Sequence, residues 1–447
     1  MSEPISERRA SNRRALIVLT LAVIGSASML YYHTRLFLPR VQQMRAARGL
    51  DNANAFGGDF YPIWLTSRQS LAGRHDLYTA ETTQEIQKGL FGHPLTAQHP
   101  TDLPADYRVF AYPAFTDLLF WPAAMLGFPT LRFFLVGVLA IIAAGTIWLW
   151  MRALEWRVHP VWLVTIMLLA FSSYPVLEAL FAEQPGLIVG FLLALSLVAL
   201  RRNSQSLAGL LLAMTTIKPQ VTLLVILYLL LWSCQDWRRR KRLALSFLAT
   251  ISLLVGASVL VWPHWIGAWL GITFRYYGYA PLPLAALLLG SAWAARMGSL
   301  LIITLLAAAA VLAWKTRRAE IASREFWVSM SLLLAITSVA LLPGQAVYDH
   351  IILLPGILIL ARDRHAHGHL RLPTRALRTI GATVFFWPWV AAFAMVLARL
   401  FMTPEHFHSL FVLALPIRTA ASLPFVVLAL LALTARSSTR PFAMSPR

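Results

Sequence analysis

The sequence predicts an all-α protein that crosses a membrane about twelve times and has a long first extracytoplasmic loop bearing surface helices. Of its 447 residues, 58% are hydrophobic and only 13% are charged, whereas soluble domains have roughly 45–50% and 25%. This composition excludes a soluble multi-domain enzyme, because too few charged side chains are present to cover its surface. The basic residues form short clusters between long apolar stretches, which is how orientation in a bilayer is encoded. The formal charge of +20 therefore indicates membrane topology, and we expect no nucleic-acid partner.

The first predicted span is 15–38, an apolar stretch long enough for a transmembrane helix. Arg8, Arg9, Arg13 and Arg14 precede it. Because basic residues mark the cytoplasmic side, the amino terminus should be cytoplasmic and this helix an uncleaved anchor.

Residues 39–130 are then predicted to form the first extracytoplasmic loop, with juxtamembrane helices. Within it, 112–128 is apolar but contains Pro113 and Pro122. A crossing there would put the next basic cluster outside, so we predict a helix lying on the outer membrane surface. The apolar stretch 281–295 is flanked by prolines and receives the same interpretation.

The remaining spans follow from the later basic clusters, each of which should be cytoplasmic. These clusters lie at 152–157, 201–202, 238–242, 315–324, 362–378 and 436–447. An even number of crossings between successive clusters places helices at 131–151, 160–178, 185–200, 207–217, 220–233, 243–262, 297–314, 326–342, 347–361, 379–398 and 415–434. The sequence thus predicts one integral membrane domain over 1–447, with a helix bundle at 131–434 and a cytoplasmic tail at 435–447.

One predicted crossing, 207–217, is too short to span an undeformed bilayer, since it reaches only about 17 Å at the helical rise. Short helices at membrane depth persist only where protein or a water-filled cavity covers their loose backbone groups. We therefore predict a cavity near Lys218, Pro219 and Gln220.

Polar side chains are predicted to gather at the outer ends of the helices. Any one of them could simply reach water, as polar side chains at helix ends do. As a group, however, they lie next to helix-breaking prolines at one end of the predicted bundle. This grouping favours a binding site for an amphiphile with an anionic head group. The group comprises Glu178, Glu183, Gln184, Lys218, Gln220, Arg275, Gln345, Tyr348, Asp349 and His350.

Asp59 follows two glycines and precedes the aromatic-rich stretch 60–64. If that stretch rests on the membrane surface, the carboxyl group is partly desolvated, which raises its proton affinity and makes it a better base. The alternative is a helix N-cap, for which Asp is a favoured residue.

The chain offers little support for a metal or cofactor. The predicted outer loop has no adjacent acidic pair to hold a divalent cation. The histidines at 365, 367 and 369 lie among arginines on the predicted cytoplasmic side, so a solvated basic loop is favoured over a metal site. The single cysteine, Cys234, excludes a disulfide framework. We expect no cofactor.

Five motifs in this order resemble glycosyltransferase family 87 over about residues 15–361. They are Gly57-Gly58-Asp59-Phe60-Tyr61, Leu77-Tyr78, Ala111-Tyr112-Pro113, Ile217-Lys218-Pro219-Gln220 and Tyr348-Asp349-His350. The family has the multi-spanning glycosyltransferase C fold and includes polyprenyl-phosphate-mannose-dependent α-mannosyltransferases. The resemblance implies an enzyme of the bacterial plasma membrane that transfers a sugar from a polyprenyl monophosphate donor to a lipid or glycan hydroxyl at the extracytoplasmic face. Mannose is the leading candidate for the sugar, and the transfer would invert the anomeric configuration.

The resemblance also implies roles for individual residues. Asp59 would be the catalytic base. Donor contacts would come from Lys218, Gln220 and His350. Beside these residues, we expect donor contacts from Tyr348 and Arg275, and possible contacts to the acceptor or the sugar from Tyr61, Tyr112, Glu183, Gln184 and Gln345.

Two alternatives stay open. A transporter or flippase of lipid-linked saccharides should carry ionisable residues at mid-membrane in both halves, but here they gather at one face, with Arg418 as the main exception. A pentosyl (arabinofuranosyl) transferase on the same fold cannot be separated from a hexosyltransferase by sequence alone.

Overall fold

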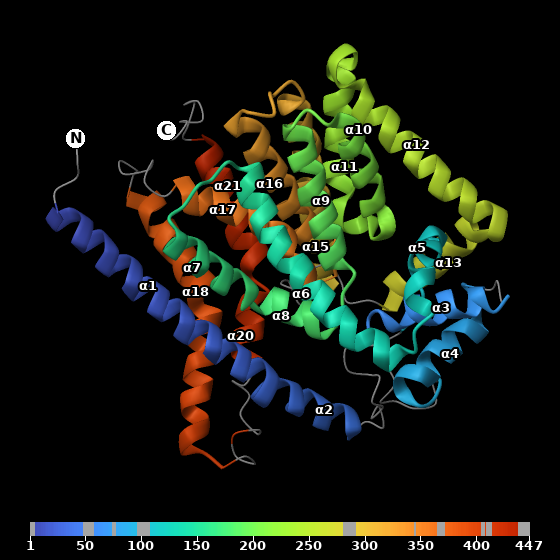
Figure 1. Cartoon of the computed structure of the whole chain (residues 1–447), viewed down its shortest axis with the longest axis horizontal. Coiled ribbons are helices and arrows are strands. Elements are labelled where there is room, and N and C mark those ends of the chain that lie inside the picture. Colours follow the sequence, from blue (N-terminus) through green and yellow to red (C-terminus); the bar gives the residue numbers. More distant parts are fainter. Residues whose placement is uncertain are drawn as a thin grey trace.

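The computed structural model of the chain describes residues 5–47, 58–73, 77–95, 108–279, 292–343, 346–363, 372–403, 407 and 414–436. These described residues form helices and their connections, with no β-strand among them. The predicted all-α class is therefore confirmed (Figure 1). The surface segment predicted at 281–295, the histidine loop at 365–369 and Gln345 lie wholly or mostly outside the described residues.

The helices run in the following order. The amino-terminal part contains α1 (Ile5–Tyr31), η1 (Tyr32–Phe37), α2 (Leu38–Ala46), α3 (Tyr61–Leu71), α4 (Ala80–Phe91), α5 (Ala114–Ala124) and α6 (Phe128–Ala153). The middle part contains α7 (Pro160–Phe171), α8 (Tyr174–Phe181), α9 (Gly186–Arg201), α10 (Gln205–Met214), η3 (Thr215–Ile217), α11 (Pro219–Gln235), α12 (Trp237–Val261) and α13 (Trp265–Tyr279). The carboxy-terminal part contains α15 (Ala292–Thr316), α16 (Arg324–Ala340), η4 (Val347–Leu353), α17 (Leu354–Arg362), α18 (Leu372–Phe401), α20 (Leu415–Ala420) and α21 (Leu423–Arg436).

Every predicted crossing coincides with one or more of these helices. Within the described residues, six helices are long and apolar enough to cross a membrane, or up to seven if a bent pair counts as one span. Helices α9, α11 and the α10–η3 segment are shorter apolar helices. The structure thus supports a multi-pass membrane protein, while the count of about twelve crossings stays a prediction.

The bent pair is the predicted crossing at 160–178, which breaks at Ser172 and Ser173 into α7 and α8 with a bend of 56°. Pro175 explains the break, because its ring would clash with the carbonyl of residue 171 in a continuous helix and its nitrogen has no hydrogen to donate. The bend directs α8 toward the elements that build the site described below.

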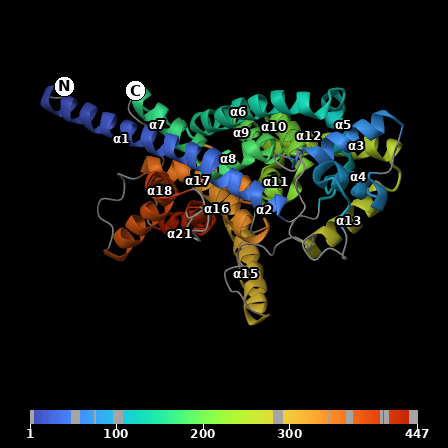
Figure 2. The same cartoon turned by 90° about the horizontal axis from the view of Figure 1, so that it is seen from below.

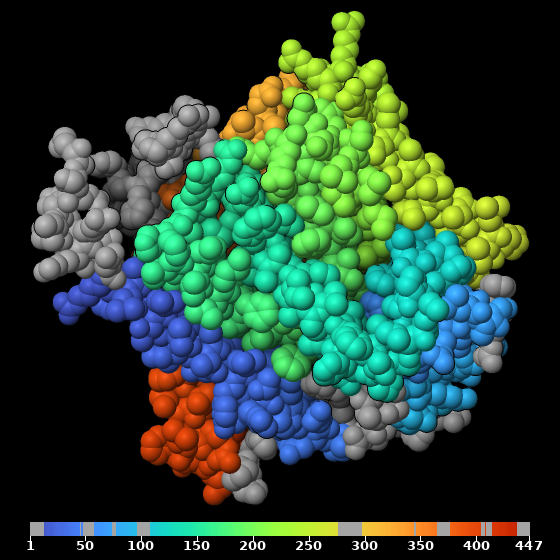
Figure 3. Space-filling view, in the orientation of Figure 1, coloured from blue at the N-terminus to red at the C-terminus, as the bar shows by residue number. Residues whose placement is uncertain are grey.

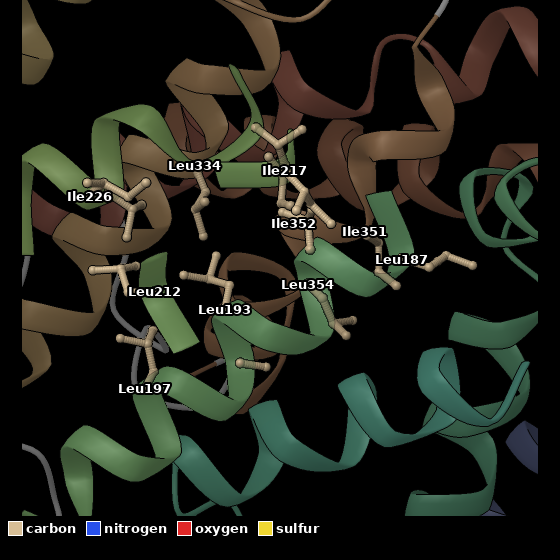
Figure 4. Packing of buried hydrophobic residues seen from close by; sticks show 14 of the residues in the cluster. Leu187, Leu193, Leu197, Leu212, Ile217, Ile226, Leu334, Ile351, Ile352 and Leu354 are labelled. Atoms are coloured by element: carbon tan, nitrogen blue, oxygen red, sulfur yellow. The ribbon is translucent and has the colours of Figure 1, made fainter. Parts of the chain in front are cut away.

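The short helices lie inside the bundle and the long ones around it. Leucine and isoleucine side chains of α9, α10, α11, α16, η4 and α17 form one buried core (Figure 4). At Gly209 the backbone of α10 lies so close to the Leu243 carbonyl of α12 that an added Cβ would overlap it. In contrast, α12 and α15 are largely exposed in the part of the chain described, and α15 projects from the body (Figure 2). The short predicted crossing at 207–217 is therefore covered by α9 and α12 on one side, while Leu207 and Leu210 are exposed.

The outer loop contributes α3, α4 and α5, so the segment predicted as a surface helix at 112–128 does contain a helix. Asp117 ties α5 to α3: Trp121 Nε1 donates to its carboxylate at 3.0 Å, and the Ser67 hydroxyl donates to its main-chain oxygen at 3.1 Å. Burial raises the pKa of this carboxyl group. The connection holds α3 in place, and α3 begins two residues after Asp59.

The predicted cytoplasmic clusters meet at one end of the bundle. Arg201 pairs with Glu155, and Arg240 pairs with Glu320. Arg324 pairs with Asp363. Further links across this end are Arg362 to the Leu154 oxygen and Arg317 to the Gln235 side chain. We name this the arginine end. Its existence agrees with the prediction that these basic clusters all lie on one side of the membrane.

Candidate functional site

Asp59 lies at the opposite end of the bundle, where two other segments converge on it, one at Arg108 and one in the turn between α8 and α9. Its amide donates to the Ala182 oxygen at the end of α8 at 3.1 Å. Its carboxylate pairs with Arg108 and accepts a hydrogen bond from Gln184 Nε2. The Asp59 side chain is only 12% exposed. The carboxylate is thus oriented by two side chains, and its backbone is anchored to the end of α8.

Gln184 connects this carboxylate to a second ion pair. Its side-chain oxygen accepts from Lys218 Nζ at 3.1 Å. Lys218 Nζ in turn donates to both oxygens of Asp349 at 2.7 Å each and lies 4.9 Å from the centre of the Tyr348 ring. We call the connected set Arg108, Asp59, Gln184, Lys218 and Asp349 the polar chain.

Local sequence explains how the polar chain assembles. Lys218 stands between the η3 turn and α11, and Pro219 at the start of α11 forces that break. Gly186 begins α9, and an added Cβ there would overlap Asp349 Oδ1. The missing side chain lets the Asp349 carboxylate reach the amino-terminal end of α9, where the helix dipole favours negative charge.

Glu183 directly precedes Gln184 and lies under strain. Its φ of 56° is in the left-handed region, which costs a non-glycine residue about 1–2 kcal/mol. The side chain is fully buried, with Arg132 Nε donating to Oε1 at 2.5 Å. Oε2 has no hydrogen-bond partner among the described residues. Burial raises the pKa of this carboxyl group to about 7, although Arg132 opposes the shift.

The sequence matches the family model of glycosyltransferase family 87 over residues 110–343. The chain belongs to this family. No curated protein and no solved structure matches it. Membership makes the protein a glycosyltransferase. The matched region contains Glu183, Gln184 and Lys218, whereas Asp59 and the 348–350 motif lie outside it.

In this glycosyltransferase, several residues singled out from the sequence come together. Asp59, Gln184, Lys218 and Tyr348 lie in or against the polar chain. The alternative role of Asp59 as a helix cap is not observed, because Phe60 is the N-cap of α3 and that cap has no side-chain hydrogen bond. The Asp59 carboxylate instead contacts Arg108 and Gln184, and its role as a base stays a prediction.

Other predicted residues are placed differently. His350 is buried next to Asp349, and its Nδ1 has no partner among the described residues. Gln220 is half-buried in the first turn of α11. Arg275 is exposed on α13, where its Nε donates to the Gly271 oxygen at 3.4 Å. The described contacts thus leave Arg275 outside the polar chain.

Tyr61 and Tyr112, predicted to contact the acceptor or the sugar, both make contacts within the protein. Tyr61 is buried, with its ring against Trp64 and Phe128 and its hydroxyl so close to Gly89 that no side chain would fit there. Tyr112 is half-buried, and its main-chain oxygen accepts from the Tyr78 hydroxyl at 2.8 Å.

Sequence reasoning missed Arg108 and gave Asp349 no role of its own. Arg108 stands just before the motif at 111–113, and its place at the end of the polar loop is the only signal it gives. Asp349 was named among the polar residues at the outer helix ends and in the motif with Tyr348 and His350. Its role as the partner of Lys218 depends on a contact between segments 131 residues apart.

Proposed function

We propose that this glycosyltransferase moves a sugar from a polyprenyl monophosphate donor to a hydroxyl group of a lipid or glycan at the extracytoplasmic face, with inversion. Mannose is the first sugar to test. The observation that carries the proposal is the shielded Asp59 carboxylate, joined through Gln184 to the Lys218–Asp349 ion pair.

The reaction needs a base for the acceptor and stabilisation for the leaving group. The acceptor oxygen forms a bond to the anomeric carbon while the bond from that carbon to the phosphate oxygen breaks. Asp59 takes the proton of the acceptor hydroxyl, and the electron pair of the broken bond leaves with the polyprenyl phosphate. Charged donors near the phosphate stabilise the developing negative charge.

The polar chain offers two cations for that phosphate. Arg108 is partly exposed, with 25% of its side chain accessible, and a guanidinium group suits phosphate recognition. All three hydrogens of the Lys218 ammonium group are engaged by Asp349 and Gln184. A phosphate would therefore bind Lys218 by replacing one of these partners. His350 adds a buried ring at the same place.

The orientation is inferred from the arginine end. Since basic clusters mark the cytoplasmic side, the polar chain at the opposite end would face outside, within reach of a lipid-linked donor in the outer leaflet. We retain the twelve-span glycosyltransferase C fold and the bacterial plasma membrane as parts of the proposal. The flippase alternative needs ionisable groups accessible from both sides. The connected polar chain lies at one end of the bundle, whereas the pairs described at the other end link basic clusters that mark orientation, and this difference favours the transferase.

The substitution Asp59→Asn tests the proposed base, because it keeps the shape and removes the basicity. A positioned general base contributes about 10²–10⁴ in rate, so the variant should lose nearly all transfer while still folding and binding donor. Transfer is measured with purified protein and radiolabelled polyprenyl-phosphate mannose. Asp51→Asn, in the same loop, is the comparison and should keep wild-type activity. Full activity in Asp59→Asn would end the proposed mechanism.

A further inference from the structure

A second polar pair lies outside the polar chain, between η1 and α8. His33 Nε2 is 3.0 Å from Glu178 Oε2. A carboxylate oxygen accepts hydrogen bonds, so the contact has His33 Nε2 as its donor. The His33 side chain is fully buried, whereas 28% of the Glu178 side chain is exposed. The pair therefore has a sealed side and an open side.

The backbone around His33 departs from an ordinary helix. Residues Tyr32–Phe37 form a π-helical turn in the last part of the first predicted span. Such turns are rare and occur frequently at functional sites. An ionisable residue within a span is also costly unless it is paired, and such pairs mark sites of function. Nδ1 of His33 is buried with no partner among the described residues, which adds to that cost.

The pair is close to Asp59 through α8. Glu178 lies one helical turn before Ala182, a distance of about 5–6 Å along the helix, and the Ala182 oxygen accepts the Asp59 amide. Figures 1 and 2 both place α8 beside the junction of α1 and α2. In Figure 3 the blue α1–α2 surface meets the teal α6 surface in the same region. Glu178 is thus on the α1 side of the base, away from the Lys218 side.

The surroundings of Glu178 indicate what it can bind. Aromatic rings surround its partner His33, with Phe37, Tyr174 and Phe181 at 6.1, 5.8 and 4.9 Å between ring centroids. The Tyr174 hydroxyl is hydrogen-bonded to Glu178, which shows that this carboxylate accepts from a hydroxyl group. Apolar walls with a few placed polar groups are typical of small-ligand sites. A carboxylate repels phosphate and accepts several hydrogen bonds from hydroxyl groups. The donor phosphate should therefore bind near Arg108 and Lys218, whereas Glu178 should bind a group that carries several hydroxyls.

The geometry points to an acceptor subsite in which Glu178, held by His33, binds neighbouring hydroxyl groups of a sugar or polyol head group. The subsite rests on the proposed transfer reaction, since it orients a further hydroxyl of the same molecule toward Asp59. It names the acceptor class as a glycoside or polyol with adjacent hydroxyl groups, in place of a simple alcohol.

The test measures binding of octyl α-mannoside and its monodeoxy analogues to the full-length protein in nanodiscs, with empty nanodiscs as the blank. Losing a hydrogen bond to a charged group should weaken binding roughly ten- to a hundredfold. Glu178→Gln should therefore weaken octyl mannoside binding by at least about tenfold. It should also remove the preference for the mannoside over at least one deoxy analogue. Binding of polyprenyl-phosphate mannose should stay within about twofold.

Ser172→Ala is the matched control, because Ser172 also links α1 to this region through Ser26 at 2.9 Å and does not touch Glu178. It should leave mannoside binding unchanged. If Glu178→Gln folds poorly, His33→Gln provides the second variant and should reduce the same preference.

Unchanged discrimination among the deoxy analogues in a folded variant would overturn the subsite, as would equal effects of Ser172→Ala. Binding needs no turnover, so it separates the two hypotheses. A wild-type protein that binds mannoside through Glu178 but transfers no sugar would contradict the proposed function alone.

Discussion

The two ends of the helix bundle use charge differently. At the arginine end, two of the three acidic partners are open to solvent, since Glu155 is 63% exposed and Glu320 is 75% exposed, whereas Asp363 is 16% exposed. At the other end, Lys218 and Asp349 are only 8% and 1% exposed. Exposed pairs contribute about 0–1 kcal/mol, whereas a buried pair has a desolvation cost that can exceed its attraction. The contrast supports our proposals that the arginine end sets orientation and that the polar chain serves the transfer reaction.

Single helices join the two ends. Helix α9 has Gln184 and Gly186 at one end and Arg201 at the other, and its 16 residues span about 24 Å. The η4–α17 segment runs likewise from Asp349 to Arg362. The helices that build the site are therefore fixed at the far end by residues that take no part in it.

The largest effect expected within this comparison is at Lys218. Removing a charge-assisted contact is worth roughly 1.5–3 kcal/mol, so Lys218→Ala should weaken donor use by about ten- to a hundredfold. His350→Ala should act in the same range if its ring serves the donor phosphate. The rate at limiting donor and saturating acceptor measures both effects.

Folding must be separated from donor use in that experiment. Lys218→Ala leaves Asp349 buried without its partner, which can cost about 3–5 kcal/mol of stability. Adding Asp349→Asn should restore stability without restoring activity. Turnover within about twofold of wild type in either single variant would return that residue to a merely structural role.

The smallest effect is expected at the arginine end. Glu155→Gln and Glu320→Gln each remove an exposed partner and should change transfer by less than about twofold, since such pairs contribute about 0–1 kcal/mol. The same assay and the melting temperature check this. A tenfold loss of transfer with unchanged donor binding would show that this end takes part in catalysis and would break the comparison.

Much of the fold could be predicted because its signals are local. Apolar stretches and basic clusters located the helices, and Pro175 could have revealed the break between α7 and α8. Asp59, Gln184 and Lys218 were recognisable as polar residues at helix ends beside glycines or prolines. These three residues could therefore be selected without knowing how the helices pack.

The pairings could not be predicted in this way. Arg108 pairs with Asp59, and Lys218 takes Asp349 as its partner, because distant segments meet and Gly186 leaves room for the carboxylate. Tyr61 is an aromatic residue beside the predicted base, yet α4 covers its hydroxyl. Neighbours in sequence thus indicated the region of the site, while three-dimensional packing decided which side chains share it.

The most direct test of the account supplies the purified protein, in proteoliposomes, with a panel of radiolabelled polyprenyl-phosphate sugars and with the corresponding nucleotide sugars. We expect label to move to the acceptor from a polyprenyl-phosphate sugar, with mannose as the leading candidate, and not from a nucleotide sugar. Transfer from nucleotide sugars alone, or no use of any polyprenyl donor by folded protein, would contradict the account.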